Sequence, residues 1–287
     1  MLGVSARHLP DPPRLTGVAM DLWAALKQLR VESLELTIGA EPDEPAFFSL
    51  AAEALREGFD LSFHTPYPEA LDLREFGAGV RRSAGADRVK EFYRTWLGGV
   101  AALPLGSRKP MLVVHGVNAP GTEPEAASAA RATTVAFLRW LARACAEQAA
   151  RMQLAFELRP RREGWTKVGS SCAEVLTVVE ETGLADLGIC WDVGHSIVNL
   201  LRQDDGWPPP PAFLKRTVHT HLHLATAEED HFPVTSPAAL LSEGLALLAG
   251  VAYRGVLNLE CHFTCWEEVV TSAELVGRLW EEAQEHG

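Results

Sequence analysis

The stretch Gly188-Ile189-Cys190-Trp191-Asp192 is a short apolar run that ends in a carboxylate, and the same pattern recurs along the chain. Charged and imidazole side chains are seldom buried without a partner. If the runs are parallel strands of one sheet, their ends meet at one face, and there we expect the chemistry. Six further runs end in, or just before, an acidic or imidazole residue: Leu34-Glu35, Phe63-His64, Val114-His115, Phe156-Glu157, His219-Thr220-His221 and Leu259-Glu260.

Strand-like and helix-like segments alternate along the whole chain. Short segments rich in Val, Ile, Leu and Phe predict strands at 2–6, 32–38, 60–64, 111–117, 154–158, 188–193, 217–224 and 255–262. Helical patterns lie at 17–29, 45–56, 86–103, 123–150, 172–181, 211–216, 237–248 and 266–285. Eight strand-then-helix units predict a closed (β/α)8 barrel, a TIM barrel of the α/β class, with residues 1–287 as its single domain.

A doubly wound open sheet is the alternative fold. Eight units exceed its usual need, and no Gly-rich phosphate loop follows the first strand. Three long stretches without periodicity, 66–85, 159–171 and 225–236, follow strands that carry a motif residue. We therefore expect these stretches to be the loops that shape an active site.

Bulk composition excludes several classes of protein. The formal charge of −12 disfavours a large nucleic-acid-binding face, because neutralising phosphates needs clustered Lys and Arg. The five cysteines form no C-x-x-C pair, which is typical of buried free thiols in a reducing compartment. We see neither a signal peptide nor an apolar run that could span a membrane, so we expect a cytoplasmic protein. The aromatic residues near Trp207-Pro208 and Trp266 suit a contact in a homodimer.

Four of the strand-end residues predict a metal site. Glu157, Asp192, His221 and Glu260 belong to strands five to eight, which are neighbours around half of the barrel rim. Three carboxylates and one imidazole suit a hard or borderline divalent ion, such as Mn²⁺, Mg²⁺, Co²⁺ or Zn²⁺. Water or substrate oxygens would complete the coordination.

Other residues are candidates for an additional metal or for substrate binding. In Asp192-Val193-Gly194-His195 the glycine predicts a tight turn that returns His195 to the mouth, and the alternative role of His195 is to cap the next helix. His64 and His115 end strands three and four. One interpretation is that they bind an additional metal or the substrate, and the alternative is that they are hydrogen-bonded histidines of the rim. Further candidates lie in the loop after strand seven, Glu229 and His231, although a solvated acidic turn explains them nearly as well.

The sequence leaves the roles of two more groups of residues open. His219, His221 and His223 alternate, so they face one side of the sheet, and the outer two lie about 13 Å apart at the rise of a strand. They therefore cannot all ligate one ion, and spacing alone does not choose the ligand. A basic group follows Glu157 and could hold a phosphate or carboxylate, or be solvated: Arg159, Arg161, Arg162 and Lys167.

At these residues the chain resembles the xylose-isomerase-like TIM-barrel superfamily, which unites sugar isomerases and epimerases with endonuclease IV. The resemblance spans essentially the whole chain and keeps the order of the motifs. The segments that carry it are Phe63-His64-Thr65-Pro66-Tyr67, Val113-Val114-His115-Gly116, Phe156-Glu157, Cys190-Trp191-Asp192-Val193-Gly194-His195, His219-Thr220-His221-Leu222-His223 and Leu259-Glu260.

The resemblance implies a shared metal site at Glu157, Asp192, His221 and Glu260. The strand-seven motif of the superfamily selects His221, whereas Leu224 stands where the family usually has Asp. In the sugar isomerases and epimerases one ion holds substrate oxygens, and two glutamates transfer a proton at a carbon next to a carbonyl. Glu157 and Glu260 would be those catalytic residues. The expected substrate is a small sugar, polyol or keto-acid, and Mn²⁺ is the favoured ion.

Two alternatives remain. In endonuclease IV three zinc ions bind a phosphodiester, and the additional ligands would be His64, His115, His195 and His231, with Glu229 where that class usually has Asp. The acidic charge and the irregular Glu229-Asp230-His231 element disfavour this interpretation. A barrel that only binds metal or sugar is the other alternative, but a binder has no need of two opposed glutamates.

Overall fold

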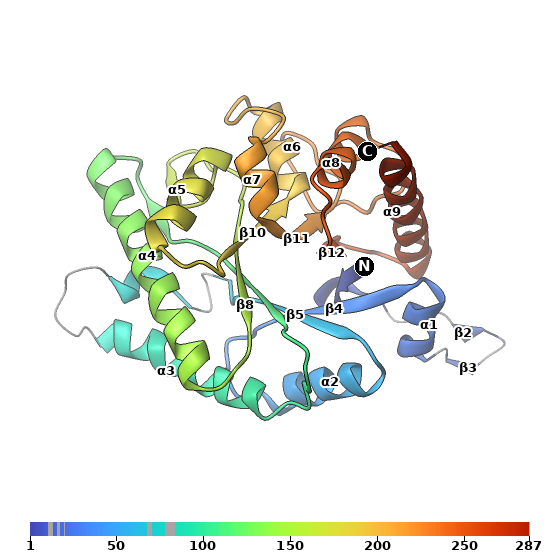
Figure 1. Ribbon diagram of the computed structural model, residues 1–287, viewed down its shortest axis with the longest axis horizontal. Helices are drawn as coiled ribbons and strands as arrows, with labels where there is room; N and C mark the ends of the chain where they lie inside the picture. Colours follow the sequence, from blue (N-terminus) through green and yellow to red (C-terminus); the bar gives the residue numbers. More distant parts are fainter. Residues whose placement is uncertain (11–13, 16–17, 20, 68–70, 78–83, 287) are drawn as a thin grey trace.

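The computed structural model describes residues 1–10, 14–15, 18–19, 21–67, 71–77 and 84–286. Eight parallel strands close into a barrel in the order β1-β12-β11-β10-β8-β6-β5-β4, which confirms the predicted (β/α)8 architecture (Figure 1). The barrel strands are β1 (Leu2–Ser5), β4 (Val31–Thr37), β5 (Asp60–His64), β6 (Met111–Val114), β8 (Gln153–Glu157), β10 (Gly188–Asp192), β11 (Thr217–Leu222) and β12 (Val256–Leu259).

Helices surround the barrel, as Figure 1 shows for α2, α3 and α4. The outer helices are α1 (Leu22–Gln28), α2 (Pro45–Arg56), α3 (Ala84–Ala101), α4 (Pro124–Glu147), α5 (Cys172–Thr182), α7 (Pro211–Arg216), α8 (Ala239–Gly250) and α9 (Trp266–His286). The predicted limits of α2 and α7 agree with these bounds. Pro45 begins α2 at a position where its missing N–H costs nothing, and Gly183 ends α5 with a left-handed φ of 64°.

The predicted helix at 17–29 is wrong at its start. Residues 16, 17 and 20 lie outside the described residues, and Val18–Ala19 form strand β3, which pairs with β2 (Arg14–Leu15). The helix α1 begins at Leu22, because the Asp21 carboxylate accepts a hydrogen bond from the Trp23 N–H. Two short 3-10 helices, η1 (Ala6–His8) and η2 (Leu73–Phe76), were not predicted either.

The helix α6 (Val193–Leu201) replaces the predicted turn after strand β10. Asp192 ends the strand and also begins the helix, since its Oδ1 accepts a hydrogen bond of 2.7 Å from the His195 N–H. Gly194 is therefore helical, and its role is steric. A Cβ at Gly194 would lie 2.0 Å from Cε1 of His223, so only glycine leaves room for that ring.

A small two-stranded sheet lies outside the barrel, and one of its strands falls in the stretch 159–171 that was predicted to have no regular structure. Strand β7 (Asn118–Pro120) pairs antiparallel with β9 (Trp165–Lys167), and the second of these lies within the loop after Glu157. Arg159 links this small sheet to the barrel, because its Nη1 donates to the Gly116 carbonyl at 3.2 Å and to Asn118 Oδ1 at 2.7 Å. The loop that follows strand β8 thus contains a paired strand and is hydrogen-bonded to the segment after β6.

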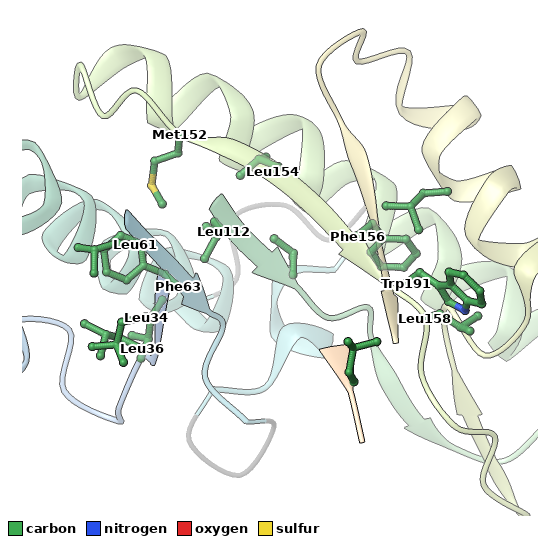
Figure 2. Packing of buried hydrophobic residues seen from close by; sticks show 14 of the residues in the cluster. Leu34, Leu36, Leu61, Phe63, Leu112, Met152, Leu154, Phe156, Leu158 and Trp191 are labelled. Carbon is green, nitrogen blue, oxygen red and sulfur yellow. The ribbon is translucent and has the colours of Figure 1, made fainter. Parts of the chain in front are cut away.

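The large apolar side chains of the strands pack with helix residues in one continuous core. Figure 2 shows Leu61, Phe63, Leu112, Phe156 and Trp191 in this layer, where each is buried. Burying such a side chain contributes about 1.5–3 kcal/mol. A separate small cluster consists of Val113, Ala155 and Cys190, and each of these alternates with residues of the outer core.

Polar residues fill much of the remaining barrel interior. They alternate along the strands with the apolar residues that face the helices, as in Leu61-Ser62-Phe63-His64 and Leu257-Asn258-Leu259-Glu260. The buried set is Ser5, Ser33, Glu35, Ser62, His219 and Asn258, which lie deeper than the strand-end residues of the mouth. These residues therefore form a hydrogen-bonded polar layer beneath the strand-end residues.

The two aromatic residues that suggested a dimer contact pack within the chain. Trp266 is buried, and the half-buried Trp207 ring lies 5.9 Å from that of Trp191. The homodimer contact stays a prediction. Across the described part of the chain, no helix combines the length and the hydrophobicity needed to span a membrane.

Candidate metal centre at the barrel mouth

Four strand-end residues meet at the mouth as the sequence predicts. Glu157 ends β8, Asp192 ends β10, His221 lies on β11, and Glu260 directly follows β12. One ligand atom from each lies within 4.8 Å of all the others, and all four residues are buried. The parallel register explains the meeting, since it pairs Asp192 with His221 on adjacent strands.

The geometry of this group fits a divalent ion. Nδ1 of His221 lies 2.8 Å from Glu260 Oε2, 3.5 Å from Glu157 Oε1 and 3.8 Å from Asp192 Oδ2. This nitrogen and Asp192 Oδ2 nevertheless have no hydrogen-bond partner among the residues that the structure describes. Buried polar atoms without partners are rare, so an ion that accepts their lone pairs accounts for them.

The charges of the group depend on one another. Burial raises the pKa of Glu157, but His115 and His221 outweigh that effect and hold it well below its usual value. Burial lowers the pKa of His221, whereas Cys190 and Glu260 raise it well above its usual value. The carboxylates are thus charged at neutral pH, and a metal ion would have to displace a proton from His221.

His64 and His115 form a second group with Glu157. Their Nε2 atoms lie 3.3 Å and 2.7 Å from Glu157 Oε2, and the three ligand atoms lie within 4.8 Å of one another. Burial and the nearby Arg159 lower the pKa of His115 to about 3, so a neutral ring donates its Nε2–H to the carboxylate. Nδ1 of His64 donates to the Thr65 carbonyl at 2.8 Å.

His195 and His231 form the third group around Asp192. Nδ1 of His195 lies 2.8 Å from Asp192 Oδ2, and Nδ1 of His231 lies 2.6 Å from Asp230 Oδ1. Burial lowers the pKa of His231, but Asp230 and Glu260 raise it to about 10. His231 reaches toward the first group as well, since its Nε2 is 3.7 Å from Glu260 Oε2.

Glu229 lies apart from these groups. Its side chain is exposed, because a turn closed by Thr226 uses the Glu229 backbone, with hydrogen bonds of 2.8 Å and 3.1 Å. The neighbouring residue Asp230 instead contacts His231, and its Oδ2 lies 3.7 Å from Nε2 of His195. In the structure Asp230, rather than Glu229, is thus the carboxylate of this loop that lies beside the two histidines.

The three alternating histidines, two on strand β11 and His223 just after it, face three different partners. Nε2 of His219 lies 3.0 Å from Glu35, deep in the barrel, and His221 belongs to the mouth. Nδ1 of His223 lies 3.0 Å from the His231 N and 3.2 Å from the Leu224 carbonyl, and its Nε2 lies 3.0 Å from Asp192 Oδ1. His223 therefore contacts Asp192 and belongs to the same group of possible ligands as His195 and His231.

The rim carries further groups that the sequence patterns did not single out. A cavity of about 730 Å³ adjoins the mouth and is lined by Arg7, Tyr67 and apolar residues such as Phe47. The Arg7 guanidinium lies 4.3 Å from the centre of the Tyr67 ring, which is 5.7 Å from that of His64. These residues come from η1, from α2 and from the segment after β5, so no single strand-end or helical pattern marks them as a group.

The basic residues after Glu157 divide into different environments. Arg161 is exposed and pairs with Asp204 at 3.4 Å, and Arg162 stacks on Trp165 at 4.8 Å. Lys167 is half-buried, and burial together with Arg159 lowers its pKa to about 7.

The fold and this mouth define a (β/α)8 barrel with a buried centre of carboxylates and imidazoles. The profile of the family described as xylose isomerase-like TIM barrel matches residues 23–277, and the chain belongs to that family. No curated protein matches its sequence significantly.

Several solved structures share this fold. A D-tagatose 3-epimerase-like protein superposes with a TM-score of 0.70 at 19% identity, over 99% of this chain and 98% of that one. The D-psicose 3-epimerase from Clostridium cellulolyticum H10, solved with D-tagatose, gives 0.69 at 12% identity over 98% of each chain. The D-allulose 3-epimerase from Methylomonas sp., in complex with D-allulose, gives 0.67 at 15% identity over 99% and 96%. At these identities the likeness establishes the fold.

Proposed function

We propose that this protein is a divalent-metal-dependent sugar epimerase or isomerase that moves a proton at a carbon next to a carbonyl. The observation that carries the proposal is the meeting of two buried, charged glutamates, Glu157 and Glu260, around one imidazole. The solved structures named for sugar 3-epimerases support it through their shared fold. The expected substrate is therefore a small ketose, with polyols and keto-acids as chemically related candidates.

The ion would be held by Glu157, Asp192, His221 and Glu260. Three carboxylates and one imidazole favour Mn²⁺, and the same donors accept Mg²⁺, Co²⁺ or Zn²⁺. When bound, a divalent ion polarises the substrate carbonyl and so makes the adjacent proton easier to remove.

The two glutamates supply the proton transfer. One carboxylate removes the proton from the carbon, and the other returns a proton to the opposite face, which inverts that carbon. Each has an imidazole beside it that can share a proton: His64 Nε2 lies 3.3 Å from Glu157, and His231 Nε2 lies 3.7 Å from Glu260. Enclosure within the barrel keeps bulk water away from the carbon while it is deprotonated.

Phosphodiester hydrolysis is the second candidate. The observation that favours it is the group of His64, His115 and Glu157, which offers three ligand atoms for an additional ion. The net charge of −12 opposes it, because a nucleic acid would be repelled from most of the surface.

The test is to incubate the Mn²⁺-loaded protein with ketoses in D₂O and follow the products by NMR. The panel contains D-tagatose, D-allulose and L-ribulose, the sugars named for the structural neighbours. We expect conversion to an epimer or isomer with deuterium at the carbon that changes. Absence of conversion across the panel, together with cleavage of abasic DNA by a zinc-loaded sample, would establish the second candidate instead.

A further inference from the structure

Glu35 lies at the centre of the polar interior, below the proposed metal ligands. It is on strand β4, and only 1% of it is exposed. Its Oε1 accepts hydrogen bonds from Ser5 Oγ at 3.0 Å and Asn258 Nδ2 at 3.2 Å. Its Oε2 accepts from Ser62 Oγ at 3.2 Å and His219 Nε2 at 3.0 Å. Both oxygens of this carboxylate are thus fixed.

The same carboxylate also contacts the histidine of the mouth. Nε2 of His221 lies 3.2 Å from Glu35 Oε1 and 3.3 Å from Oε2. The partners of Glu35 come from β1, β5, β11 and β12, which with β4 are consecutive in the barrel. A buried charge costs several kcal/mol unless it is paired and hydrogen-bonded. The donors around Glu35 therefore compensate for the burial of its charge.

The two nitrogens of the His221 ring therefore point in opposite directions. Nε2 faces Glu35 on the inner side, and Nδ1 faces Glu157, Asp192 and Glu260 on the outer side. A histidine that binds metal commonly donates its other N–H to a carboxylate, which fixes both the ring orientation and the nitrogen left for the metal.

We propose that Glu35 is a positioning residue that aims Nδ1 of His221 at the metal centre. The inference rests on the metal site of the proposed function, but not on the identity of the substrate. His219 supports the arrangement: its ring stands nearly perpendicular to that of His221, with centroids 5.4 Å apart, and it occupies the remaining side of Glu35 Oε2. The carboxylate consequently cannot swing away from His221 without losing several hydrogen bonds.

The test measures Mn²⁺ affinity by competition with a chelator, without substrate. Glu35→Gln keeps the shape of the side chain but replaces one acceptor oxygen by an NH₂ group, which is a donor. In either orientation of the amide, this NH₂ group faces groups that donate hydrogen bonds to Glu35. We expect the affinity for Mn²⁺ to fall about 10- to 100-fold, the usual effect of losing such a partner. Ser62→Ala is the matched control, because it removes one hydrogen bond from Glu35 but no contact with His221; its affinity should stay within about threefold of wild type.

A second measurement uses the wild-type protein and does not depend on the stability of a variant. In the Zn²⁺-loaded, ¹⁵N-histidine-labelled protein, we expect the His221 spectrum to show a proton on Nε2 and metal on Nδ1. Metal on Nε2 would overturn the inference, as would a folded Glu35→Gln variant that binds Mn²⁺ like wild type. If the wild-type protein binds no divalent ion, the metal-dependent function and this inference fall together; in the other two cases only this inference does.

Discussion

His221 Nδ1 and Glu260 Oε2 lie 2.8 Å apart, yet no hydrogen bond joins them within the described part of the chain. His221 lies on β11 and Glu260 directly follows the adjacent strand β12, and the nitrogen also faces Glu157 and Asp192. Close approach without hydrogen-bond geometry is what ligand atoms show when they are directed at a common centre. This relationship underlies the predictions below.

Replacing either glutamate should abolish proton transfer. Glu157→Gln and Glu260→Gln each remove one acid/base group, so we expect kcat to fall about 10²- to 10⁴-fold. The measurement is deuterium incorporation into the epimerised sugar by NMR. Glu163→Gln, in the exposed part of the loop that follows Glu157, is the control and should leave the rate unchanged. Full activity in either glutamine variant would remove that residue from the mechanism.

The number of bound ions separates the two candidate functions. If the protein is an epimerase, one ion is bound per chain, and His115→Ala leaves that number unchanged because His115 donates to Glu157. Metal content per chain, measured by mass spectrometry after gel filtration, provides the check. Three zinc ions in the wild type, with fewer in His115→Ala, would support the nuclease.

Divalent ions should also stabilise the fold. An ion that binds only the folded chain adds about 2.7 kcal/mol when its concentration is 100 times its Kd. We expect EDTA to lower the Tm of the wild-type protein and Mn²⁺ to restore it. Asp192→Asn serves as the comparison, because it loses a ligand and should show a smaller response. Equal Tm values with EDTA and with Mn²⁺ would contradict a bound ion at this centre.

The Asp230–His231 pair should stabilise the protein over a defined pH range. The pKa of His231 rises from 6.5 to about 10, so its contribution is complete below about pH 6.5 and is lost as the pH rises toward 10. The pKa of Asp230 falls from 3.8 to about 2, so its contribution is complete above about pH 3.8 and is lost as the pH falls toward 2.

The test compares the unfolding of wild type and Asp230→Asn between pH 4 and pH 10. Because the pair is partly exposed, we expect a difference of about 1 kcal/mol from pH 4 to 6.5, which decreases toward pH 10. Glu229→Gln removes the adjacent, exposed carboxylate and should show no such dependence. A difference that grows with pH would mean that the pair is not an ion pair.

Gly194 should not tolerate a larger residue. In Gly194→Ala the new Cβ would lie 2.0 Å from Cε1 of His223, which must move away from Asp192. We expect a loss of about 1–3 kcal/mol in urea unfolding and weaker Mn²⁺ binding. Gly277→Ala in α9 is the matched control, because its Cβ meets no described atom within 4 Å; it should stabilise the helix slightly. Similar behaviour of the two variants would disprove the steric role.

The architecture and the grouping of Glu157, Asp192, His221 and Glu260 followed from local sequence. Apolar runs of strand length alternate with helical periods, and the ends of parallel strands must meet at one edge. The helix α6 was not predicted because its N-cap, Asp192, is also the last residue of strand β10. The same residue thus marks both the end of a strand and the start of a helix, and no residues separate the two elements. Gly194 indicated a turn, but the structure shows a glycine within a helix, where the lack of a Cβ leaves room for the His223 ring.

The inner polar layer was harder to predict. Leu34-Glu35 counted among the runs that end in an acidic residue, yet strand β4 continues to Thr37, and Glu35 is buried and hydrogen-bonded inside the barrel. A signal was present, because Ser62 and Asn258 each precede a strand-end residue by two positions and so share its side of the strand. That these residues meet Glu35 depends on barrel closure, which no local pattern encodes.

Closure of the barrel also determines when the centre can form. Strand β1 pairs with β12, Leu2 beside Leu257 and Val4 beside Leu259, so the earliest and latest strands to be synthesised meet at one seam. Glu260 follows that last strand, and Ser5 and Asn258, from the two strands of the seam, both donate to Glu35 Oε1. During translation the nascent chain consequently has an incomplete ligand set until β12 leaves the ribosome. The proposed four-residue centre is therefore complete only after nearly the whole chain has been synthesised.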